Sequence, residues 1–368
     1  MQHPYRPIVI AGVAILATTG LAAPAQASSA RTWQVSPGTG TISQAVTMAR
    51  AGDTLVLKAG TFRDSVMIDK TLTIRGAGWS KTIINPPASS NNPCNQGGSM
   101  EGLCVFGVLD SMGNPDLTKP VRNVSISDLR LTGFDDGVLG LNTKGLKVRH
   151  VRADHNTGYG IARFASTLSN FSENWTSWNG EAGLYMGDSP KAASVIRENR
   201  TDHNGIGIFM RDSTGLTATS NQSWGNCVGI LALNSGGEAA PWDLPAGDYK
   251  IRGNHVWANN KECPPADGHP GFSGLGIALA GVHDVVVRDN KVSNNSSTQA
   301  SDLPKGGIVV FSTAFLGGAD PTNNTVAGND LRGNTPADIF WDGTGTGNVV
   351  RDNKCRTAIP GTLGWCSK

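Results

Sequence analysis

Three carboxylic acids and a tyrosine stand immediately before predicted strands in the middle of the chain. Asp135 and Asp136 precede one strand, Tyr159 takes the matching place one coil later, and Glu181 stands beside that place on the coil after. In a stack of coils Asp135 and Glu181 share a column, roughly 9–10 Å apart by strand spacing. The acid and base of an inverting glycosidase stand ~6.5–9.5 Å apart. These four residues are therefore candidate catalytic residues, and the alternative role of the carboxylates is to cap turns.

Two Asp-His-Asn triplets form a second candidate group. They lie at residues 154–156 and 202–204, two coils apart, so that His155 and His203 share a column with Trp178 between them. An aspartate next to a histidine is a reasonable acid/base combination, which makes both histidines candidate catalytic residues. Duplication of a repeat would produce the same pattern without any function. The intervening tryptophan keeps the imidazoles too far apart to share a metal ion.

Aromatic residues and an arginine occupy the columns expected to face outward on three successive strands. Phe164, Tyr185, Phe209 and Arg211 would form an exposed sugar-binding face, because aromatic rings stack on the apolar faces of sugars. A surface covered by a loop is the alternative. Arg163 falls in an inward column, where an unpaired arginine would be costly. We expect it either to turn outward at a bulge or to pair with an acid.

Asp188 and Asp212 close adjacent strands in one column. Carboxylates about 5 Å apart are a weak candidate for binding Ca²⁺, although aspartate is also a common turn residue. No other metal site is predicted, because the chain has no C-x-x-C pair and its histidines are scattered. Three segments leave the coil pattern and should form loops that shape a cleft, namely residues 234–247, 261–273 and 296–304.

A repeated asparagine pair indicates the elements that hold these residues. Two asparagines five residues apart recur along the chain, and the first members of successive pairs are 22 to 39 residues apart. The short intervals correspond to one bare coil, and the long ones to a coil with an insertion. The pairs are Asn174/Asn179, Asn199/Asn204, Asn221/Asn226, Asn254/Asn259, Asn290/Asn295 and Asn329/Asn334.

Most of these pairs are followed by a glycine, an apolar residue and a segment in which apolar residues alternate. A period of two is typical of strands. Short strands repeated at this interval stack as parallel coils about 4.8 Å apart, and the turn asparagines then align into a hydrogen-bonded ladder. The sequence therefore predicts an all-β parallel β-helix. Asn174, Asn199 and Asn221 lie in N-x-[ST] sequons, but we expect them to serve the ladder rather than to carry glycans.

The N-terminal part of the repeat region resembles a known family. Thr41-Ile42-Ser43-Gln44 is typical of a capping box and predicts a short helix through Arg50 that covers the open end of the stack. Residues 42–78 resemble the entry cap and first coils of the pectin-lyase-like right-handed β-helix superfamily, and the later coils resemble its parallel β-helix repeats. The resemblance implies a right-handed helix. It specifies no reaction, because the superfamily includes lyases, hydrolases, epimerases, esterases and non-catalytic surface proteins.

The run Asp135-Asp136-Gly137-Val138 also resembles the paired-aspartate motif of polygalacturonases, although that family's Asn-Thr-Asp, Gly-His-Gly and Arg-Ile-Lys motifs do not occur here. The expected function is cleavage or modification of an extracellular polysaccharide, with uronate polymers among the candidates, by hydrolysis or β-elimination. The alternative is a non-catalytic extracellular β-helix that binds sugars, a metal or partner proteins. Ca²⁺ is the one cofactor that the sequence suggests.

The ends and composition of the chain point to export. Residues 1–27 have the basic start, short apolar run and Ala-Gln-Ala ending of a signal peptide, which leaves residues 28–368 as one β-helix domain. No later segment predicts a membrane span. The chain has 31 basic and 29 acidic residues, which argues against binding nucleic acid, and a monomer is expected. Six cysteines suggest disulfides, for which nearest-neighbour pairing is one of fifteen possibilities: Cys94–Cys104, Cys227–Cys263 and Cys355–Cys366.

Overall fold

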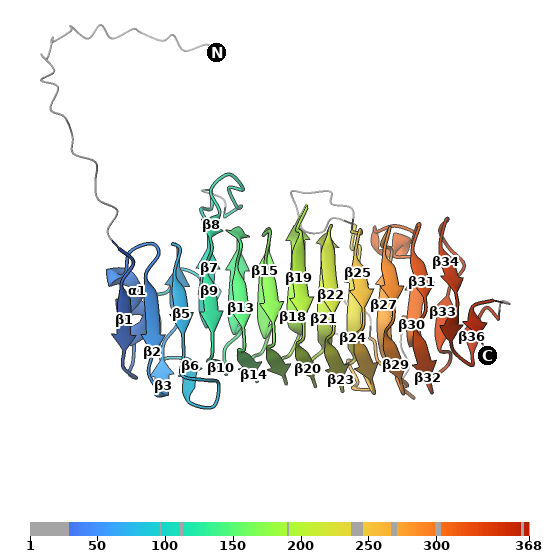
Figure 1. The fold of residues 1–368 in the computed structure, drawn as a ribbon, viewed down its shortest axis with the longest axis horizontal. Helices are drawn as coiled ribbons and strands as arrows, with labels where there is room; N and C mark the ends of the chain where they lie inside the picture. Colours follow the sequence, from blue (N-terminus) through green and yellow to red (C-terminus); the bar gives the residue numbers. More distant parts are fainter. Residues whose placement is uncertain are drawn as a thin grey trace, which may run out of the picture.

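The chain winds through three parallel sheets to form an elongated right-handed β-helix (Figure 1). The computed structural model describes residues 29–367, apart from 96, 111–112, 190, 237–245, 266–270, 299–302 and 362–363. Each complete coil contributes one strand to each sheet, and every pair of neighbouring strands is parallel. We call the three sheets A, B and C, in the order in which a coil visits them. The predicted signal segment lies outside the described residues.

Sheets A and B each contain twelve strands. Sheet A consists of β1 (Thr32–Val35), β2 (Thr54–Leu57), β5 (Thr73–Arg75), β9 (Ser125–Ser127), β13 (Lys147–Arg149), β16 (Asn170–Ser172), β19 (Ser194–Arg197), β22 (Leu216–Thr219), β25 (Lys250–Arg252), β28 (Val286–Arg288), β31 (Thr325–Ala327) and β34 (Val349–Arg351). Sheet B consists of β3 (Gly60–Arg63), β6 (Thr82–Asn85), β10 (Arg130–Thr132), β14 (Arg152–Asp154), β17 (Trp175–Ser177), β20 (Arg200–Asp202), β23 (Gln222–Trp224), β26 (His255–Trp257), β29 (Lys291–Ser293), β32 (Asp330–Arg332), β35 (Asn353–Lys354) and β37 (Cys366–Ser367).

Sheet C contains eleven strands, and a small additional sheet pairs two more. Sheet C consists of β4 (Val66–Ile68), β7 (Leu103–Phe106), β11 (Val138–Leu141), β15 (Ile161–Phe164), β18 (Ala182–Ser189), β21 (Ile206–Ser213), β24 (Val228–Leu233), β27 (Leu275–Ala280), β30 (Gly306–Phe311), β33 (Ile339–Trp341) and β36 (Ala358–Ile359). The additional sheet pairs β8 (Val121–Arg122) with β12 (Thr143–Lys144).

The asparagine pairs form two ladders, one at each end of the sheet B strands. Asn179 shows the pattern: its backbone N–H and its side-chain Nδ2 both donate to Oδ1 of Asn204, at 3.1 and 2.8 Å, and Nδ2 also donates to the carbonyl of Ala153. Asn174 repeats this arrangement with Asn199 in the other ladder. The ladder asparagines are buried, so their amides supply the partners that the turn backbone requires. The predicted ladder is confirmed.

The register predicted from the sequence is also confirmed. In sheet C, Ile161 aligns with Leu184 and Ile208, and these side chains are fully buried inside the helix. The alternate residues face outward. The interior apolar residues form one continuous cluster from Val35 to Trp365, which stacking of coils explains, because each coil buries its apolar side chains against the next.

A short helix closes the N-terminal end of the stack. Helix α1 (Thr41–Met48) buries Ile42, Ala45 and Val46 in the interior cluster, as predicted. The predicted capping box is wrong, since the N-cap is Gly40 with a left-handed backbone and no side-chain cap. Asp64 of the next coil takes its place: one carboxylate oxygen accepts the backbone N–H groups of Ile42 and Ser43 at 2.8 and 3.0 Å.

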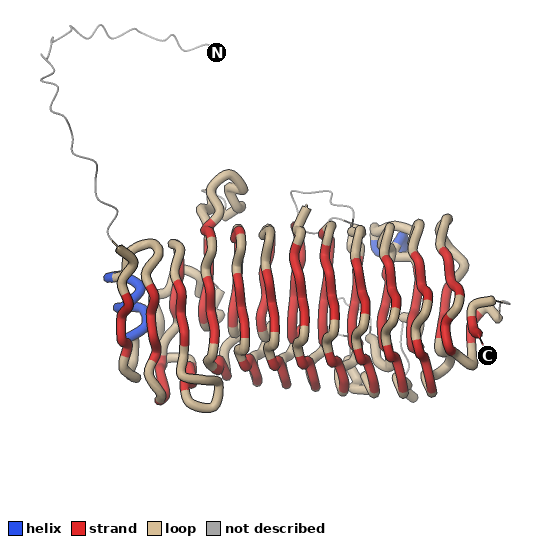
Figure 2. The backbone as a smooth tube through the Cα atoms, viewed as in Figure 1, coloured by secondary structure: helices blue, strands red, loops and turns tan. Residues whose placement is uncertain are grey.

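Three disulfides join the predicted nearest neighbours, Cys94–Cys104, Cys227–Cys263 and Cys355–Cys366. The second of these fastens an inserted segment to the start of β24. The segment that carries β8 and the one that carries the 3₁₀ helix η1 (Ala314–Leu316) stand at the upper edge of the stack in Figure 2. Within the described part of the chain, no helix is long and apolar enough to span a membrane.

Candidate active site

One outward column of sheet C carries ionisable side chains on three successive coils. The residue before the glycine that opens each strand points outward, and on these coils the column holds Glu101, Asp136 and Tyr159. The following coils carry apolar residues there, beginning with Ala182 and Ile206. These apolar residues belong to a second cluster that covers the outside of the sheet. On the coil before Glu101 the same place in the column is taken by Asp64, whose carboxylate is used to cap helix α1.

A pocket of about 420 Å³ opens on the same coils. Its walls include Asp136 at one edge of the sheet and Asp188 at the other, with apolar side chains between them. The lining residues are Phe106, Gly113, Asn114, Pro115, Asp136, Leu139, Leu141, Phe164, Ala165 and Asp188. The apolar floor between two carboxylates suits a sugar, which presents C–H groups and hydroxyls together.

Asp136 has the properties of an acid/base group. Burial raises its pKa to about 7, and the neighbouring carboxylate of Glu101 contributes in the same direction. The backbone N–H of Tyr159, which donates to its Oδ1 at 2.6 Å, opposes this shift in pKa, while Glu181 and Asp135 add to it. A carboxyl group with a pKa near 7 exchanges a proton readily at neutral pH.

Asp135 is held by turn contacts on both carboxylate oxygens. Oδ2 accepts the backbone N–H of Met100, and Oδ1 accepts the hydroxyl of Thr157. These contacts tie three neighbouring coils together at the edge of sheet C. They correspond to the turn-capping role that was the alternative interpretation of this residue.

Tyr159 and Glu181 form a pair beside Asp136. The hydroxyl of Tyr159 is hydrogen-bonded to the carboxylate of Glu181, and burial together with this negative charge raises the pKa of Tyr159. Tyr159 is therefore a neutral donor at any physiological pH, and it orients Glu181. Glu181 itself is exposed, so water can reach the carboxylate that the tyrosine orients.

Glu101 is a member of the site that sequence reasoning missed. Its Oε2 accepts the backbone N–H of Asp136 at 3.0 Å, and only 6% of the residue is exposed. Burial raises its pKa, and the charge of Asp135 adds to the effect. The run Glu101-Gly102-Leu103 repeats the pattern of Asp136-Gly137-Val138, and this was the available signal. The inserted segment between the two runs hides the repeat.

The predicted aromatic face is present but is less exposed than expected. The rings of Phe164 and Tyr185 lie 4.6 Å apart, and those of Tyr185 and Phe209 lie 5.2 Å apart. Phe164 and Phe209 are partly exposed, but Tyr185 is only 1% exposed, so its prediction as an exposed sugar platform is wrong. Tyr159 covers it, with ring centroids 4.9 Å apart.

Neither expectation for Arg163 is correct. The residue remains in its inward column, is 0% exposed, and donates through Nη1 to the carbonyl of Gly187 at 3.2 Å and to the hydroxyl of Ser189. Its Nε and Nη2 have no partner among the described residues, and burial lowers its pKa to about 10. Arg163 therefore lies in the core and cannot touch a ligand in the pocket.

The two aspartates considered for Ca²⁺ do not fit a cation site. Asp212 is already engaged: Oδ1 accepts the backbone N–H of Ser235, and Oδ2 accepts Nε of Arg211 at 3.0 Å and the hydroxyl of Ser235. The guanidinium of Arg211 supplies the positive charge that a cation would bring. Among the described residues, no group of three or more His, Cys, Asp or Glu side chains is placed to hold a metal.

His155 and His203 belong to a different surface. Nδ1 of His203 lies 2.8 Å from Asp202, and Nδ1 of His155 lies 3.5 Å from Asp154, so both histidines are engaged on the sheet B side of their turns. Trp178 separates them, as predicted, with its ring 4.4 Å from that of His203 and 6.3 Å from that of His155. Neither histidine lines the pocket.

Comparison with known proteins supports the fold. A protein-family model described as the right-handed β-helix region matches residues 118–241. Comparison with curated protein sequences finds no match. Among solved structures, the A-module of mannuronan C-5 epimerase AlgE6 from Azotobacter vinelandii is similar, with 17% identity, a TM-score of 0.61, and coverage of 88% of this chain and 91% of that one.

Two further structures share the fold. An alginate lyase from Paenibacillus sp. str. FPU-7 is 16% identical, with a TM-score of 0.57 and coverage of 86% of this chain and 99% of that one. DFA-IIIase from Arthrobacter chlorophenolicus A6, in complex with GF2, is 11% identical, with a TM-score of 0.54 and coverage of 91% and 99%. The chain is thus a right-handed parallel β-helix protein, as its resemblance to the pectin-lyase-like superfamily predicted.

Proposed function

We propose that the chain is an extracellular carbohydrate-active enzyme that cleaves a polysaccharide, with Asp136 as its general acid. The observation that carries the proposal is a carboxyl group of pKa about 7 on the wall of an apolar-floored pocket, beside a second, exposed carboxylate. The signal-peptide pattern and the three disulfides support secretion. Enzymes that act on carbohydrates among the structures of the same fold support the substrate class.

The reaction would use Asp136 and Glu181 as an acid and base pair. Protonated Asp136 gives its proton to the glycosidic oxygen as the bond to the leaving sugar breaks. Glu181, oriented by Tyr159, takes a proton from the water that attacks the anomeric carbon. The two residues lie two coils apart in adjacent columns, which places their backbones roughly 10 Å apart. Carboxyl groups ~6.5–9.5 Å apart would leave room for a water and give inversion of configuration.

The charge of the site favours hydrolysis of a neutral sugar over β-elimination on a uronate. Glu101, Asp135 and Glu181 all surround Asp136 and raise its pKa, so the site is already rich in negative charge. A uronate carboxylate would add to that repulsion. Arg211 acts electrostatically on Tyr159 of this cluster, and its Nε donates to Asp212. Asp188 is too far along the sheet to act with Asp136, since Asp136 is level with Ala182 and the six residues of strand from there to Asp188 span roughly 20 Å.

The test is a screen of the purified mature protein against neutral and uronate polysaccharides, with two readouts. New reducing ends without unsaturated products from a neutral polymer are expected, and Asp136→Asn should lower the rate by about 10²–10⁴-fold. Glu198→Gln, a like change on an exposed turn, is the matched control and should retain full activity. Unsaturated products from a uronate polymer would show that the reaction is β-elimination and would contradict hydrolysis. Binding of a polysaccharide without any product would favour the non-catalytic alternative.

A further inference from the structure

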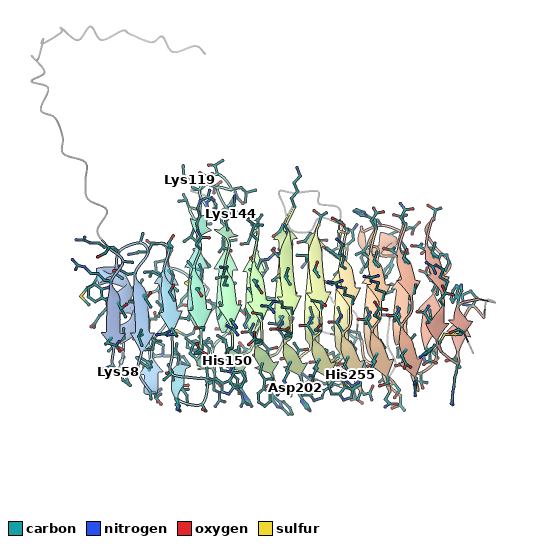
Figure 3. The ribbon with its side chains drawn as sticks, viewed as in Figure 1. Lys58, Lys119, Lys144, His150, Asp202 and His255 are labelled. Atoms are coloured by element: carbon teal, nitrogen blue, oxygen red, sulfur yellow. A yellow bond between two sulfur atoms is a disulfide. The ribbon has the colours of Figure 1, made fainter. Side chains whose placement is uncertain are left out.

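The outer face of sheet B carries a row of cationic and aromatic side chains that the pocket does not use. The first residue of each strand points outward, and on six successive coils these residues are Arg152, Trp175, Arg200, Gln222, His255 and Lys291. Coils stack about 4.8 Å apart, so the row extends roughly 24 Å along the helix axis. Figure 3 shows that Asp202 and His255 of this sheet, and His150 beside it, lie along the lower edge of the molecule.

The aromatic rings of this face are held in place by contacts with neighbouring coils. Nε1 of Trp175 donates to Asp202 at 2.6 Å, and the guanidinium of Arg152 lies 4.4 Å above the same ring. Farther along, the rings of Trp224 and Trp257 stack 4.9 Å apart. At the adjoining turn Trp178 is 53% exposed, the most exposed tryptophan of the face. Rigid, partly exposed rings bind a ligand with little loss of side-chain entropy.

Two carboxylates of this face, those of Asp154 and Asp202, are buried beneath the cations. Asp154 is 0% exposed, and its carboxylate binds both Arg130 and Arg152. These three side chains together therefore carry one net positive charge. Arg200 and Lys291 are exposed and form no ion pair with any described residue. His255 is neutral near pH 7, because burial and Lys291 lower its pKa. The face therefore presents positive charge to solvent, whereas the pocket on sheet C is acidic.

We infer that the outer face of sheet B is a second carbohydrate-binding surface, which holds an acidic polysaccharide chain along the helix axis. The charge is complementary to a uronate or sulfate polymer, and the partly exposed aromatic rings offer apolar contact to the C–H groups of its sugars. A docked protein would require an apolar centre, but no aliphatic side chain points outward in the row from Arg152 to Lys291. The surface would tether the enzyme while the pocket works on a different part of the matrix.

The inference is tested by native electrophoresis of the mature protein through gels that contain polygalacturonate, alginate or neutral dextran. The acidic polymers should retard the protein and dextran should not. The double variant Arg200→Ala/Lys291→Ala, and separately Trp178→Ala, should weaken the affinity about tenfold or more. Lys250→Ala/Arg252→Ala removes the same charge from exposed positions of neighbouring sheet A and should bind like the wild type. Circular dichroism verifies that each variant is folded.

Several results would overturn the inference. Equal weakening by the sheet A variant would show that net charge alone causes the retardation, and equal retardation by dextran would remove the electrostatic basis. Equally tight binding of duplex DNA would show a general polyanion site. Asp136→Asn should keep full retardation while it loses catalysis. Loss of binding in that variant would place the acidic polymer in the pocket, whereas failure of catalysis alone would bear only on the proposed function.

Discussion

The backbone N–H of Asp136 donates to Oε2 of Glu101 at 3.0 Å, although 35 residues separate them in the chain. The two residues occupy one outward column of sheet C on successive coils. Burial raises the pKa of both carboxyl groups. A proton is shared between two such groups more easily than two negative charges are tolerated. The pair is therefore the centre of the candidate site.

Glu101→Gln should lower the pKa of Asp136, because it removes the neighbouring charge while keeping an acceptor for the Asp136 N–H. The general acid then loses its proton at a lower pH. The alkaline limb of the profile of kcat/KM against pH should therefore move to lower pH by about one pH unit. Carbon-13 NMR titration of the Asp136 carboxyl gives the same quantity without substrate. An unchanged pKa would show that burial alone sets it.

Asp136→Asn should stabilise the protein at alkaline pH. The folded pKa is about 7 and the unfolded value is 3.8, so the folded state binds more protons between these values and stability falls as pH rises through them. The substitution removes this penalty, which amounts to about 2–4 kcal/mol above pH 7. Urea denaturation at pH 8 and at pH 4 should show a gain that disappears at the lower pH. Asp135→Asn, which loses one of two turn contacts, should show no such gain.

Asn204→Ala should destabilise the helix by about 2–4 kcal/mol, because it leaves buried partners without hydrogen bonds. The wild-type side chain accepts two bonds from Asn179, and it donates to Oδ1 of Asn226 and to the carbonyl of Thr176. The free energy of unfolding in denaturant is the measurement. Asn91→Ala, at an exposed position, should change it by less than about 0.5 kcal/mol. Equal effects would contradict a structural role for the ladder.

Arg163→Met should keep or increase stability. The arginine is fully buried with two donor groups unpaired, and the next residues in its column are Met186 and Met210, so a methionine fits the stack. Replacing a buried charge by an apolar group of similar volume often stabilises by about 1–4 kcal/mol. Thermal unfolding measures the change, and Arg163→Ala, which creates a cavity, is the comparison. A large loss with methionine would show that the charge itself is required.

Several features of the site followed from local pattern. The asparagine spacing and the alternation after each glycine place Asp135, Asp136 and Glu181 at one edge of sheet C, because a repeat of parallel coils carries its register from one coil to the next. The inward position of Arg163 followed from the same register. The burial of Arg163 was not expected, because the cost of burying its charge favoured an outward turn at a bulge, and the residue is 0% exposed.

What the sequence determined by itself was the β-helix, its columns and the ladder positions, because these depend on interactions repeated at a short, regular interval. Only the tertiary structure decided which outward columns meet solvent. Tyr185 is buried because Tyr159 and its neighbours cover it, and Glu101 joins Asp136 across an insertion that breaks the repeat. Burial and the proximity of charges set the chemistry of a carboxyl group, and both arise from segments that lie far apart in the chain.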